Sequence, residues 1–409
     1  MITPSFGLTA TERVLPSMAL DFTTASLDSR VTFTRSGNTA TVVNSSGLIA
    51  AINANLPRFD FDPVTLACKC LLIEEAKTNL FTYSNDFSNV IWTALGAGVA
   101  GTKVTSPDGT ANATPLIEDS STGQHTIYQI SATTGSKTFS VYAKNASGSR
   151  FLRLVDFNAT NGAQGETWFN LLTGTVAFGP GTIVNAGNGF YRCSITTTTT
   201  VLSTYFISIS TNGYAASYTG DGTSGFYIYG AQLEAGPFAT SYIPTVASQV
   251  TRTADVATMT GTNFSSWYNQ SEGAFVSSSL LTRQAAIGPT TIFSASDNTS
   301  ANMINCFYRA SGALGVNIFA ATVAQLDQTQ LGVTAANTIV NTGVAYKVSN
   351  TVSYANGTVQ TTSAVAAIPT VTQLQFGISP TGSSLNGYVR SLRFYKQRIL
   401  NAEGQAFSK

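Results

Sequence analysis

The chain has 409 residues, more than the roughly 250–300 that one hydrophobic core serves, so its length predicts at least two domains. Only 10% of the residues are charged, against about 25% in an ordinary soluble protein. Lysine and arginine number 21 against 20 aspartates and glutamates, without a basic run, which argues against nucleic acid and anionic membranes as partners.

The N-terminal part of the sequence contains several turns and few clean strands. We therefore predict an extended N-terminal arm over residues 1–82, which would attach the chain to its neighbours. A short helix-like period covers 73–80 within it. No run of 18 apolar residues follows anywhere in the chain, so no membrane insertion is expected, and the start MITPSFGLTATERV lacks the features of a secretion signal.

The middle third alternates short runs of Val, Ile, Thr, Phe and Tyr with clusters of Gly, Asn, Asp and Ser, a spacing typical of antiparallel sandwiches. The predicted strands cover 137–145, 150–157, 166–178, 190–200, 203–211 and 225–236. Turn signals such as Asn161-Gly162 lie between them and supply positive φ at low cost. Together they predict a jelly roll over 83–245.

The last third has the same character. Pro244 and the Ser/Thr-rich segment after it predict a linker over 246–262, followed by a second sandwich over 263–409. Within that sandwich, VSYANGTVQ predicts a hairpin around Asn356-Gly357, and the tail 401–407 has a short helical period. The expected fold is all-β, with two tandem antiparallel β-sandwich (jelly-roll) domains preceded by an extended N-terminal arm.

Segments along nearly the whole chain resemble a known group of proteins. The leader, with SGNTATVVNSSGLIA, PRFD and LLIEEAKTNL, resembles an N-terminal module of phage and prophage tail-associated proteins. The segments FSVYAK, GFYRCSI and YTGDGTSGFYIYGAQLEAG are similar to the carbohydrate-binding-module-like jelly roll of those proteins. The last third, closing on LRFYKQRILNAEGQ, resembles their concanavalin-like or laminin-G-like sandwich.

The resemblance implies a structural subunit of a tailed-bacteriophage fibre or spike, on tail or head. Such a subunit is made in the host cytoplasm, lies on the virion surface and forms a homotrimer. It contacts other virion proteins through its arm and displays its sandwiches toward host-surface polysaccharide. Two alternatives stay open: a purely structural head-fibre, decoration or collar protein without a ligand, and a depolymerase that cleaves capsule polysaccharide.

The candidate ligand-binding residues are aromatic and amide side chains, because sugar C–H faces stack on rings and sugar hydroxyls bond to amides. In ETWFNL, Trp168 and Asn170 share a strand face, and in GFYIYGAQ Tyr227 and Tyr229 do. We expect Trp168, Tyr227 and Tyr229 to form a glycan platform, unless they are buried between sheets or at a subunit interface. Further candidates in loops are Tyr214, Tyr218, Trp267 and Tyr268.

A catalytic constellation is not apparent, so an enzyme is not expected. His125 is the one histidine, and no serine has the Gly-x-Ser-x-Gly surroundings of a hydrolase nucleophile. Glycosidases use paired carboxylates. Glu74 and Glu75 are more simply packing or capping residues of the leader, and Asp60 and Asp62 belong to a turn before Pro63.

No metal site or cofactor is expected either. The four cysteines lack the paired spacing of a zinc site and are expected to be free thiols: Cys68, Cys70, Cys193 and Cys306. Asp221 in GDGTSG could contribute to a calcium loop, but calcium takes six to eight oxygens and a tight turn is the simpler interpretation.

Overall fold

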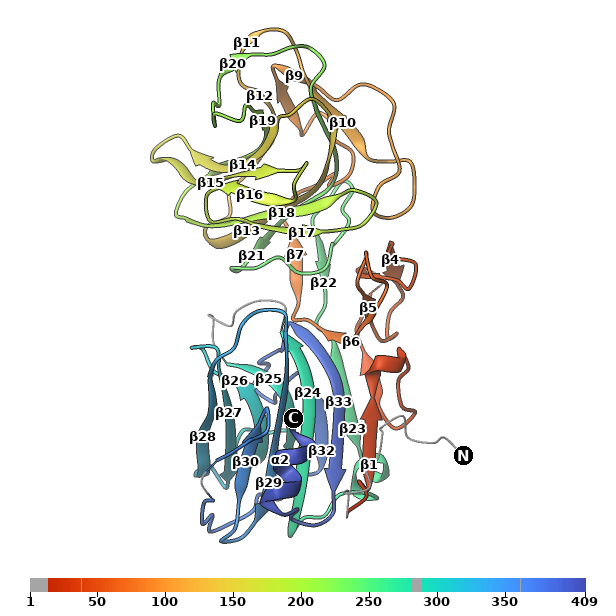
Figure 1. Ribbon diagram of the computed structural model, residues 1–409, viewed down its shortest axis with the longest axis vertical. Coiled ribbons are helices and arrows are strands. Elements are labelled where there is room, and N and C mark those ends of the chain that lie inside the picture. The colour runs from red at the N-terminus through yellow and green to blue at the C-terminus, as the bar shows by residue number, and fades with distance from the viewer. Residues whose placement is uncertain (1–13, 38, 282–288, 361) are drawn as a thin grey trace.

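A computed structural model describes residues 14–37, 39–281, 289–360 and 362–409, and shows two β-sandwiches stacked along the long axis (Figure 1). The predicted all-β class with antiparallel sandwiches is confirmed. Helical elements within the described ranges are few and short: η1 (Phe22–Thr24), α1 (Thr262–Ser265) and α2 (Asn401–Phe407). None of them is long and apolar enough to cross a membrane.

The middle sandwich consists of two six-stranded sheets. The first, here called the junction sheet, has the order β17 (Thr182–Asn185), β18 (Tyr191–Thr199), β13 (Gly135–Ser147), β21 (Gly225–Ala235), β10 (Thr114–Glu118) and β9 (Ala97–Gly98). The second, here called the distal sheet, has the order β16 (Thr175–Phe178), β15 (Gly162–Asn170), β14 (Phe151–Asn158), β19 (Ser203–Ser210), β12 (His125–Ser131) and β8 (Thr93–Leu95). The junction sheet faces the other sandwich and the distal sheet faces away from it (Figure 1).

The C-terminal sandwich has an eight-stranded and a seven-stranded sheet. The eight-stranded sheet runs β31 (Thr358–Val359), β30 (Val352–Ala355), β29 (Thr338–Lys347), β24 (Glu272–Leu281), β33 (Gly387–Tyr395), β6 (Cys68–Ile73) and β5 (Phe59–Phe61), with β1 (Met18–Asp21) also on β33. The seven-stranded sheet runs β2 (Thr32–Thr34), β23 (Val256–Thr260), β32 (Gln373–Phe376), β25 (Thr290–Ser296), β26 (Met303–Tyr308), β27 (Ala313–Ala320) and β28 (Val323–Val333).

Two local predictions for this sandwich are confirmed. The predicted hairpin joins β30 to β31, with Asn356 at φ 43° and Gly357 at φ 74°, the positive values that a type I′ turn needs. The predicted tail helix is α2, which packs on the outer face of the eight-stranded sheet. There Phe407 stacks on Tyr395, with ring centroids 5.1 Å apart.

The structure does not confirm an extended N-terminal arm over the described residues of 1–82. β1 pairs with β33, β2 pairs with β23, and β5 and β6 extend the eight-stranded sheet. Met18, Phe33 and Leu71 lie in the core of the C-terminal sandwich. Pairing satisfies the backbone groups of these short strands and removes their apolar side chains from water, which an arm in solution would not do.

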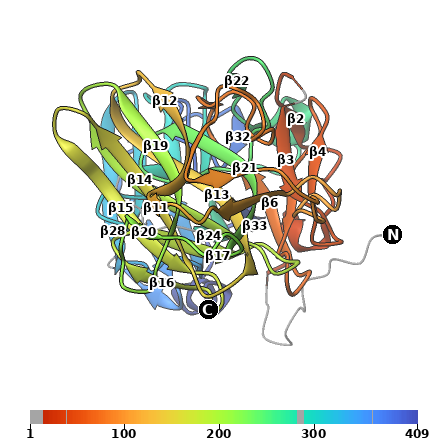
Figure 2. The same cartoon turned by 90° about the horizontal axis from the view of Figure 1, so that it is seen from above.

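The segment between the two sandwiches also differs from expectation. The stretch 73–80 is not helical, because β7 (Lys77–Asn79) pairs with β22 (Val250–Arg252) to form a two-stranded connection (Figure 1). The buried Asn79 amide donates to the Ile243 carbonyl at 2.9 Å and so joins this connection to the middle sandwich. A further leader hairpin, β3 (Ala40–Val43) and β4 (Ile49–Ile52), lies at one side of the molecule, away from β14 and β15 (Figure 2).

The four cysteines are free thiols, and three of them are buried. Burial raises the pKa of the Cys70 thiol to about 12 and raises the pKa of Cys193 well above its ordinary value. These thiols therefore act as small apolar side chains of the two cores.

Candidate functional site

The strand faces follow the predicted alternation, but the topology separates the candidate residues. Phe169 of β15 and Phe226 and Ile228 of β21 lie in the core of the middle sandwich, so Trp168 and Tyr229 point outward. However, β15 belongs to the distal sheet and β21 to the junction sheet. The structure therefore does not bring Trp168 together with Tyr227 and Tyr229, because the two outer faces lie on opposite sides of one sandwich.

Trp168 lies in an aromatic cluster on the outer face of the distal sheet. Its ring centroid is 5.5 Å from that of Phe178 and 5.6 Å from that of Tyr214, and Phe151 lies 5.9 Å from Tyr214. We call these four residues the distal aromatic cluster. Trp168 is 5% exposed, whereas Phe178 is 57% and Tyr214 41% exposed. The exposed rings of Tyr214 and Phe178 thus form a contact surface, and the buried ring of Trp168 packs against both of them.

Polar contacts fix the rings of the distal aromatic cluster. The Trp168 indole nitrogen donates to Ser210 Oγ at 3.0 Å, and the Arg153 guanidinium lies 5.0 Å from the Trp168 ring centroid. Arg153 is itself ion-paired with Glu166. The Tyr214 hydroxyl donates to a backbone carbonyl at 3.2 Å. A surface whose rings are already held in place loses little conformational entropy when it binds a ligand.

Further aromatic side chains extend the same outer face. Tyr128 and Phe206 are direct cross-strand partners with ring centroids 5.0 Å apart, and Phe157, 39% exposed, lies 6.3 Å from Phe206. Sequence reasoning missed these residues together with Phe151 and Phe178. The alternation that singled out Trp168 could have identified three of them, since Tyr128, Phe151 and Phe206 each neighbour a core residue along the strand.

Asn170 and Tyr218 are engaged in local structure. The Asn170 amide oxygen accepts hydrogen bonds from the backbone nitrogens of Leu172 and Thr173, at 3.0 and 3.3 Å, and closes the turn between β15 and β16. The Tyr218 hydroxyl donates to Glu118 at 2.5 Å, and the Tyr218 ring lies 4.6 Å from that of His125. Neither side chain belongs to the distal aromatic cluster.

Tyr229 packs in a cluster of aromatic side chains on the outer face of the junction sheet, where Tyr227 is a partly buried neighbour. Tyr229 is 4% exposed, its ring lies 5.8 Å from Tyr142 and 5.5 Å from Tyr242, and its hydroxyl donates to Asp108 at 3.1 Å. Burial raises the pKa of the Tyr229 hydroxyl strongly. Tyr229 is therefore a packing residue rather than part of an open platform.

Of the two candidates in the C-terminal sandwich, Trp267 belongs to the core and Tyr268 packs against it. Trp267 is 2% exposed and donates through its indole nitrogen to the Asn263 carbonyl at 2.6 Å. Tyr268 stacks on Phe264 with ring centroids 4.7 Å apart. These side chains follow the short helix α1 and anchor it, so they do not form a loop surface for a ligand.

Asp221 closes a tight turn and is not arranged as a calcium ligand. Its Oδ1 accepts from the backbone nitrogens of Thr223 and Ser224, at 2.8 and 2.7 Å, and its Oδ2 accepts from the Ser224 hydroxyl at 2.6 Å and from Arg150 at 3.2 Å. The hydrogen bond from the Ser224 hydroxyl is the largest of the effects that lower the pKa of Asp221. Within the described part of the chain, no three His, Cys, Asp or Glu side chains gather as a metal site would require.

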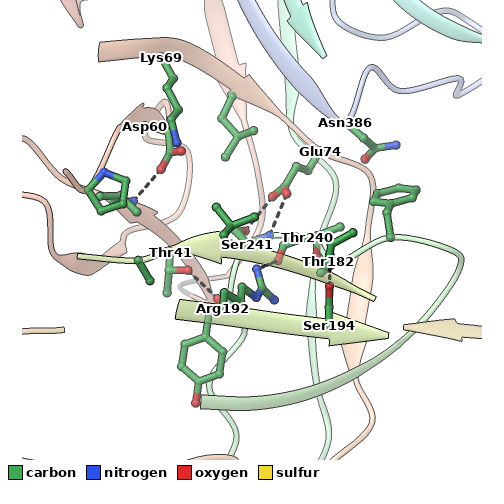
Figure 3. Close-up of a pocket in the computed structure, with 18 of the residues that line it drawn as sticks. Thr41, Asp60, Lys69, Glu74, Thr182, Arg192, Ser194, Thr240, Ser241 and Asn386 are labelled. Atoms are coloured by element: carbon green, nitrogen blue, oxygen red, sulfur yellow. Dashed lines mark hydrogen bonds between the residues drawn. The ribbon is translucent and has the colours of Figure 1, made fainter. Parts of the chain in front are cut away.

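A cleft of about 610 Å³ lies between the two sandwiches (Figure 3). The leader contributes Asp60, Lys69 and Glu74, and the junction sheet contributes Arg192 and Ser194. The walls are joined by hydrogen bonds, because the Ser241 hydroxyl of the middle sandwich donates to Glu74 at 2.7 Å. The cleft is therefore a fixed part of the interface between the sandwiches.

Two buried carboxylates face this cleft with pKa values moved in opposite directions. Burial raises the pKa of Asp60. Burial also acts to raise the pKa of Glu74, but Arg252, Arg58 and Ser241 outweigh it and lower that pKa to about 2. Divergent carboxyl pKa values are what acid–base catalysis needs.

Every oxygen of the two carboxylates, however, already accepts a hydrogen bond from the protein. Asp60 accepts from the Val43 nitrogen at 2.7 Å and from the Tyr388 hydroxyl at 2.5 Å. Glu74 accepts from the Ser241 nitrogen at 2.9 Å on one oxygen, and from the Ser241 hydroxyl and Arg58 on the other. The hydrogen bonds of both carboxylates therefore contribute to the interface between the sandwiches.

Comparison with known proteins gives only partial likenesses. No known family matches the sequence, and no curated protein does. Among solved structures, the Ruminococcus gnavus IT-sialidase CBM40 matches with 13% identity over 34% of this chain and 84% of that one, at a TM-score of 0.30. The NanB sialidase of Streptococcus pneumoniae matches with 13% identity over 36% of this chain and 26% of that one, also at 0.30. A heptameric SAP-like pentraxin from Limulus polyphemus matches with 9% identity over 34% and 70%, at 0.27. At these TM-scores the likenesses carry no functional argument.

Proposed function

We propose that this chain is a non-catalytic subunit of a bacteriophage particle and that it binds glycan through the distal aromatic cluster. The observation that carries the binding proposal is the pair of exposed rings, Tyr214 and Phe178, held over the buried Trp168. This face is directed away from the C-terminal sandwich and is therefore open to an outside ligand (Figure 1). The phage part of the proposal is supported by the resemblance of the leader and of both later segments to phage tail-associated proteins.

The chemistry of the distal aromatic cluster suits a sugar. The C–H faces of a sugar ring stack on flat aromatic side chains, while its hydroxyls bond to polar groups beside the rings. Here the Arg153–Glu166 ion pair supplies both a donor and an acceptor next to Trp168. The same surface could instead bind another subunit of a trimer, since aromatic residues are also enriched at protein interfaces.

Replacing Tyr214 by alanine tests the binding proposal. We expect Tyr214→Ala to weaken glycan binding about fivefold, since a stacked aromatic contact is worth roughly 1 kcal/mol. The measurement is an array of host-surface polysaccharides, followed by titration of any glycan that binds the unaltered chain. Tyr227→Ala is the matched control, because Tyr227 lies on the opposite sheet and should leave this binding unchanged.

A different result identifies the subunit-interface alternative. If Tyr214→Ala leaves every glycan affinity unchanged but dissociates an oligomer in sedimentation experiments, the distal aromatic cluster binds copies of this chain. The variant should still fold, which thermal unfolding checks, because Tyr214 is 41% exposed and lies outside the core of the middle sandwich.

Antibody labelling of intact particles tests the phage proposal. Gold-labelled antibody against this chain should bind at one defined place on the tail or head of particles produced by the host that carries the gene. Antibody absorbed with the purified chain is the control. Purified particles that neither label nor contain the chain by mass spectrometry would contradict a virion role.

A further inference from the structure

A row of six polar side chains crosses the outer face of the seven-stranded sheet. Each residue stands directly opposite the next in the neighbouring strand, in the order Thr258, Gln375, Ser294, Asn305, Asn317 and Asp327. Their neighbours along the strands, such as Phe293, Ile304 and Val316, lie in the core, so the six side chains face outward. With strands about 4.8 Å apart, the row is about 24 Å long. We call it the polar row.

Four acceptor oxygens of the polar row are shielded from water and have no hydrogen-bond partner within the described part of the chain. They are Ser294 Oγ, Asn305 Oδ1, Asn317 Oδ1 and Gln375 Oε1. Ser294 is 0%, Asn305 6% and Gln375 7% exposed. A shielded polar atom without a partner costs about 1–3 kcal/mol. Four such atoms in one line indicate an occupant that is rich in donors.

Apolar side chains flank the polar row on both sides. Phe307 lies two residues beyond Asn305, opposite Gly315, where a Cβ would be only 3.0 Å from the Phe307 ring. The glycine thus leaves room for that ring to lie along the sheet. On the other side of the row, Met303 and Phe319 are cross-strand partners. The row is a polar strip between two apolar edges.

The charges beside the polar row neutralise each other. Arg309 is ion-paired with Asp327 at the end of the row, and its guanidinium lies 5.2 Å from the Phe307 ring centroid. An anionic ligand would have to break the ion pair between Arg309 and Asp327. The charge distribution therefore favours a neutral ligand.

We propose that the polar row is a second binding site of this chain and that it takes a neutral oligosaccharide lying across the strands. Sugar hydroxyls reach the four unpartnered oxygens when the amide side chains of the row turn outward. The partly exposed ring of Phe319 meets the C–H faces, since Phe307 is only 5% exposed. A protein partner fits less well, because the centre of a protein interface is usually apolar and aromatic rather than a line of amides. The site does not depend on the distal aromatic cluster, which belongs to the other sandwich.

The test uses the full chain with Tyr214→Ala, so that binding at the distal aromatic cluster is already weakened. The probes are immobilised neutral oligomers of glucose, galactose, mannose and N-acetylglucosamine, from disaccharides upward. At least one oligomer should bind this chain, and adding Asn305→Ala or Asn317→Ala should weaken that binding about tenfold through the lost hydrogen bonds. Asn53→Ala is the matched control, because Asn53 is an exposed asparagine of the leader and lies outside both sites.

Thermal unfolding distinguishes a variant that has lost the binding site from one that no longer folds. Asn305→Ala removes a shielded amide that lacks a partner for its oxygen, so its thermal unfolding midpoint should stay equal or rise. If Asn305→Ala nevertheless fails to fold, Asn317→Ala alone tests the site, because Asn317 is only half-buried.

Three results would overturn this proposal. The first is a Tyr214→Ala chain that binds none of the neutral oligomers. The second is binding that Asn305→Ala and Asn317→Ala leave unchanged, and the third is self-association that these substitutions abolish. A different result would contradict glycan binding by the distal aromatic cluster. In that case Tyr214→Ala, made in the otherwise unaltered chain, leaves glycan binding unchanged.

Discussion

Replacing Asp255 by alanine should lower the free energy of unfolding by about 3–5 kcal/mol, the cost of leaving buried charges without their partner. Asp255 is 0% exposed and lies at the centre of a buried ion cluster. One carboxylate oxygen accepts from Arg35 and from Arg58 Nε, each at 3.2 Å, and the other accepts from the Glu74 backbone nitrogen at 2.9 Å and from Arg58 Nη2. Without the carboxylate, buried guanidinium groups of the cluster would repel one another.

Equilibrium unfolding in urea, followed by circular dichroism, measures this loss. Asp28→Ala is the matched control, because Asp28 pairs with Arg30 at a partly exposed site, where an ion pair contributes at most about 1 kcal/mol. If Asp255→Ala lowers the free energy of unfolding no more than Asp28→Ala does, the buried arginines have found water or other acceptors. The ion cluster would then not stabilise the fold.

The ion cluster also joins the two sandwiches to each other. Arg58 comes from the leader, Glu74 follows β6, and Asp255 lies between β22 and β23. Glu74 reaches the middle sandwich through Ser241, and Arg58 Nη1 donates to the same Ser241 hydroxyl at 2.8 Å. Segments from three parts of the sequence therefore meet at the junction between the two sandwiches.

Period-2 patterns in the sequence were sufficient to predict several of the long strands of the two sandwiches. The predicted strands 203–211 and 225–236 correspond to β19 (Ser203–Ser210) and β21 (Gly225–Ala235). Their Ile side chains and Phe226 face the core, whereas Phe206 lies on the outer face of the distal sheet. β28 (Val323–Val333) was missed, because its run Gln-Leu-Asp-Gln-Thr-Gln has few of the residues that favour strands. It pairs only with β27, along a ladder with three register shifts. The sequence of such an irregular edge strand contains little of the alternating pattern from which strands are predicted.

Long-range pairing could not be read from the sequence. β1 pairs with β33 through Met18 and Phe394, and nothing local in MALD specifies a partner so far along the chain. The same limit applies to the candidate site. Alternation correctly placed Trp168 and Tyr229 outside the core, but only the strand order shows that they lie on opposite sheets. The polar row was equally hidden, because its members come from six different strands.

Acid should destabilise the junction through Glu74. The ordinary pKa of this carboxyl is 4.5, and in the folded chain Arg252, Arg58 and Ser241 outweigh burial and lower the pKa to about 2. A carboxyl with a lowered folded pKa contributes stability that is fully present above pH 4.5 and is lost as the pH falls through about 2. The contribution is on the order of 3 kcal/mol. Asp60 acts in the opposite sense, because its raised pKa makes the buried charge unfavourable at neutral pH and acid relieves it.

Comparison with Glu74→Gln separates this effect from that of carboxylates far from the junction, which titrate equally in both chains. The variant should be less stable at pH 7, because Gln cannot neutralise Arg58 and Arg252. The difference in unfolding free energy between the two chains should then shrink as the pH falls from 4.5 toward 2, since the unaltered Glu74 becomes neutral as well. Urea titrations at several pH values within this range give the difference directly. A difference that stays constant down to pH 2 would show that Glu74 does not carry its charge in the cluster, and the argument that ionic pairing holds the junction would fail with it.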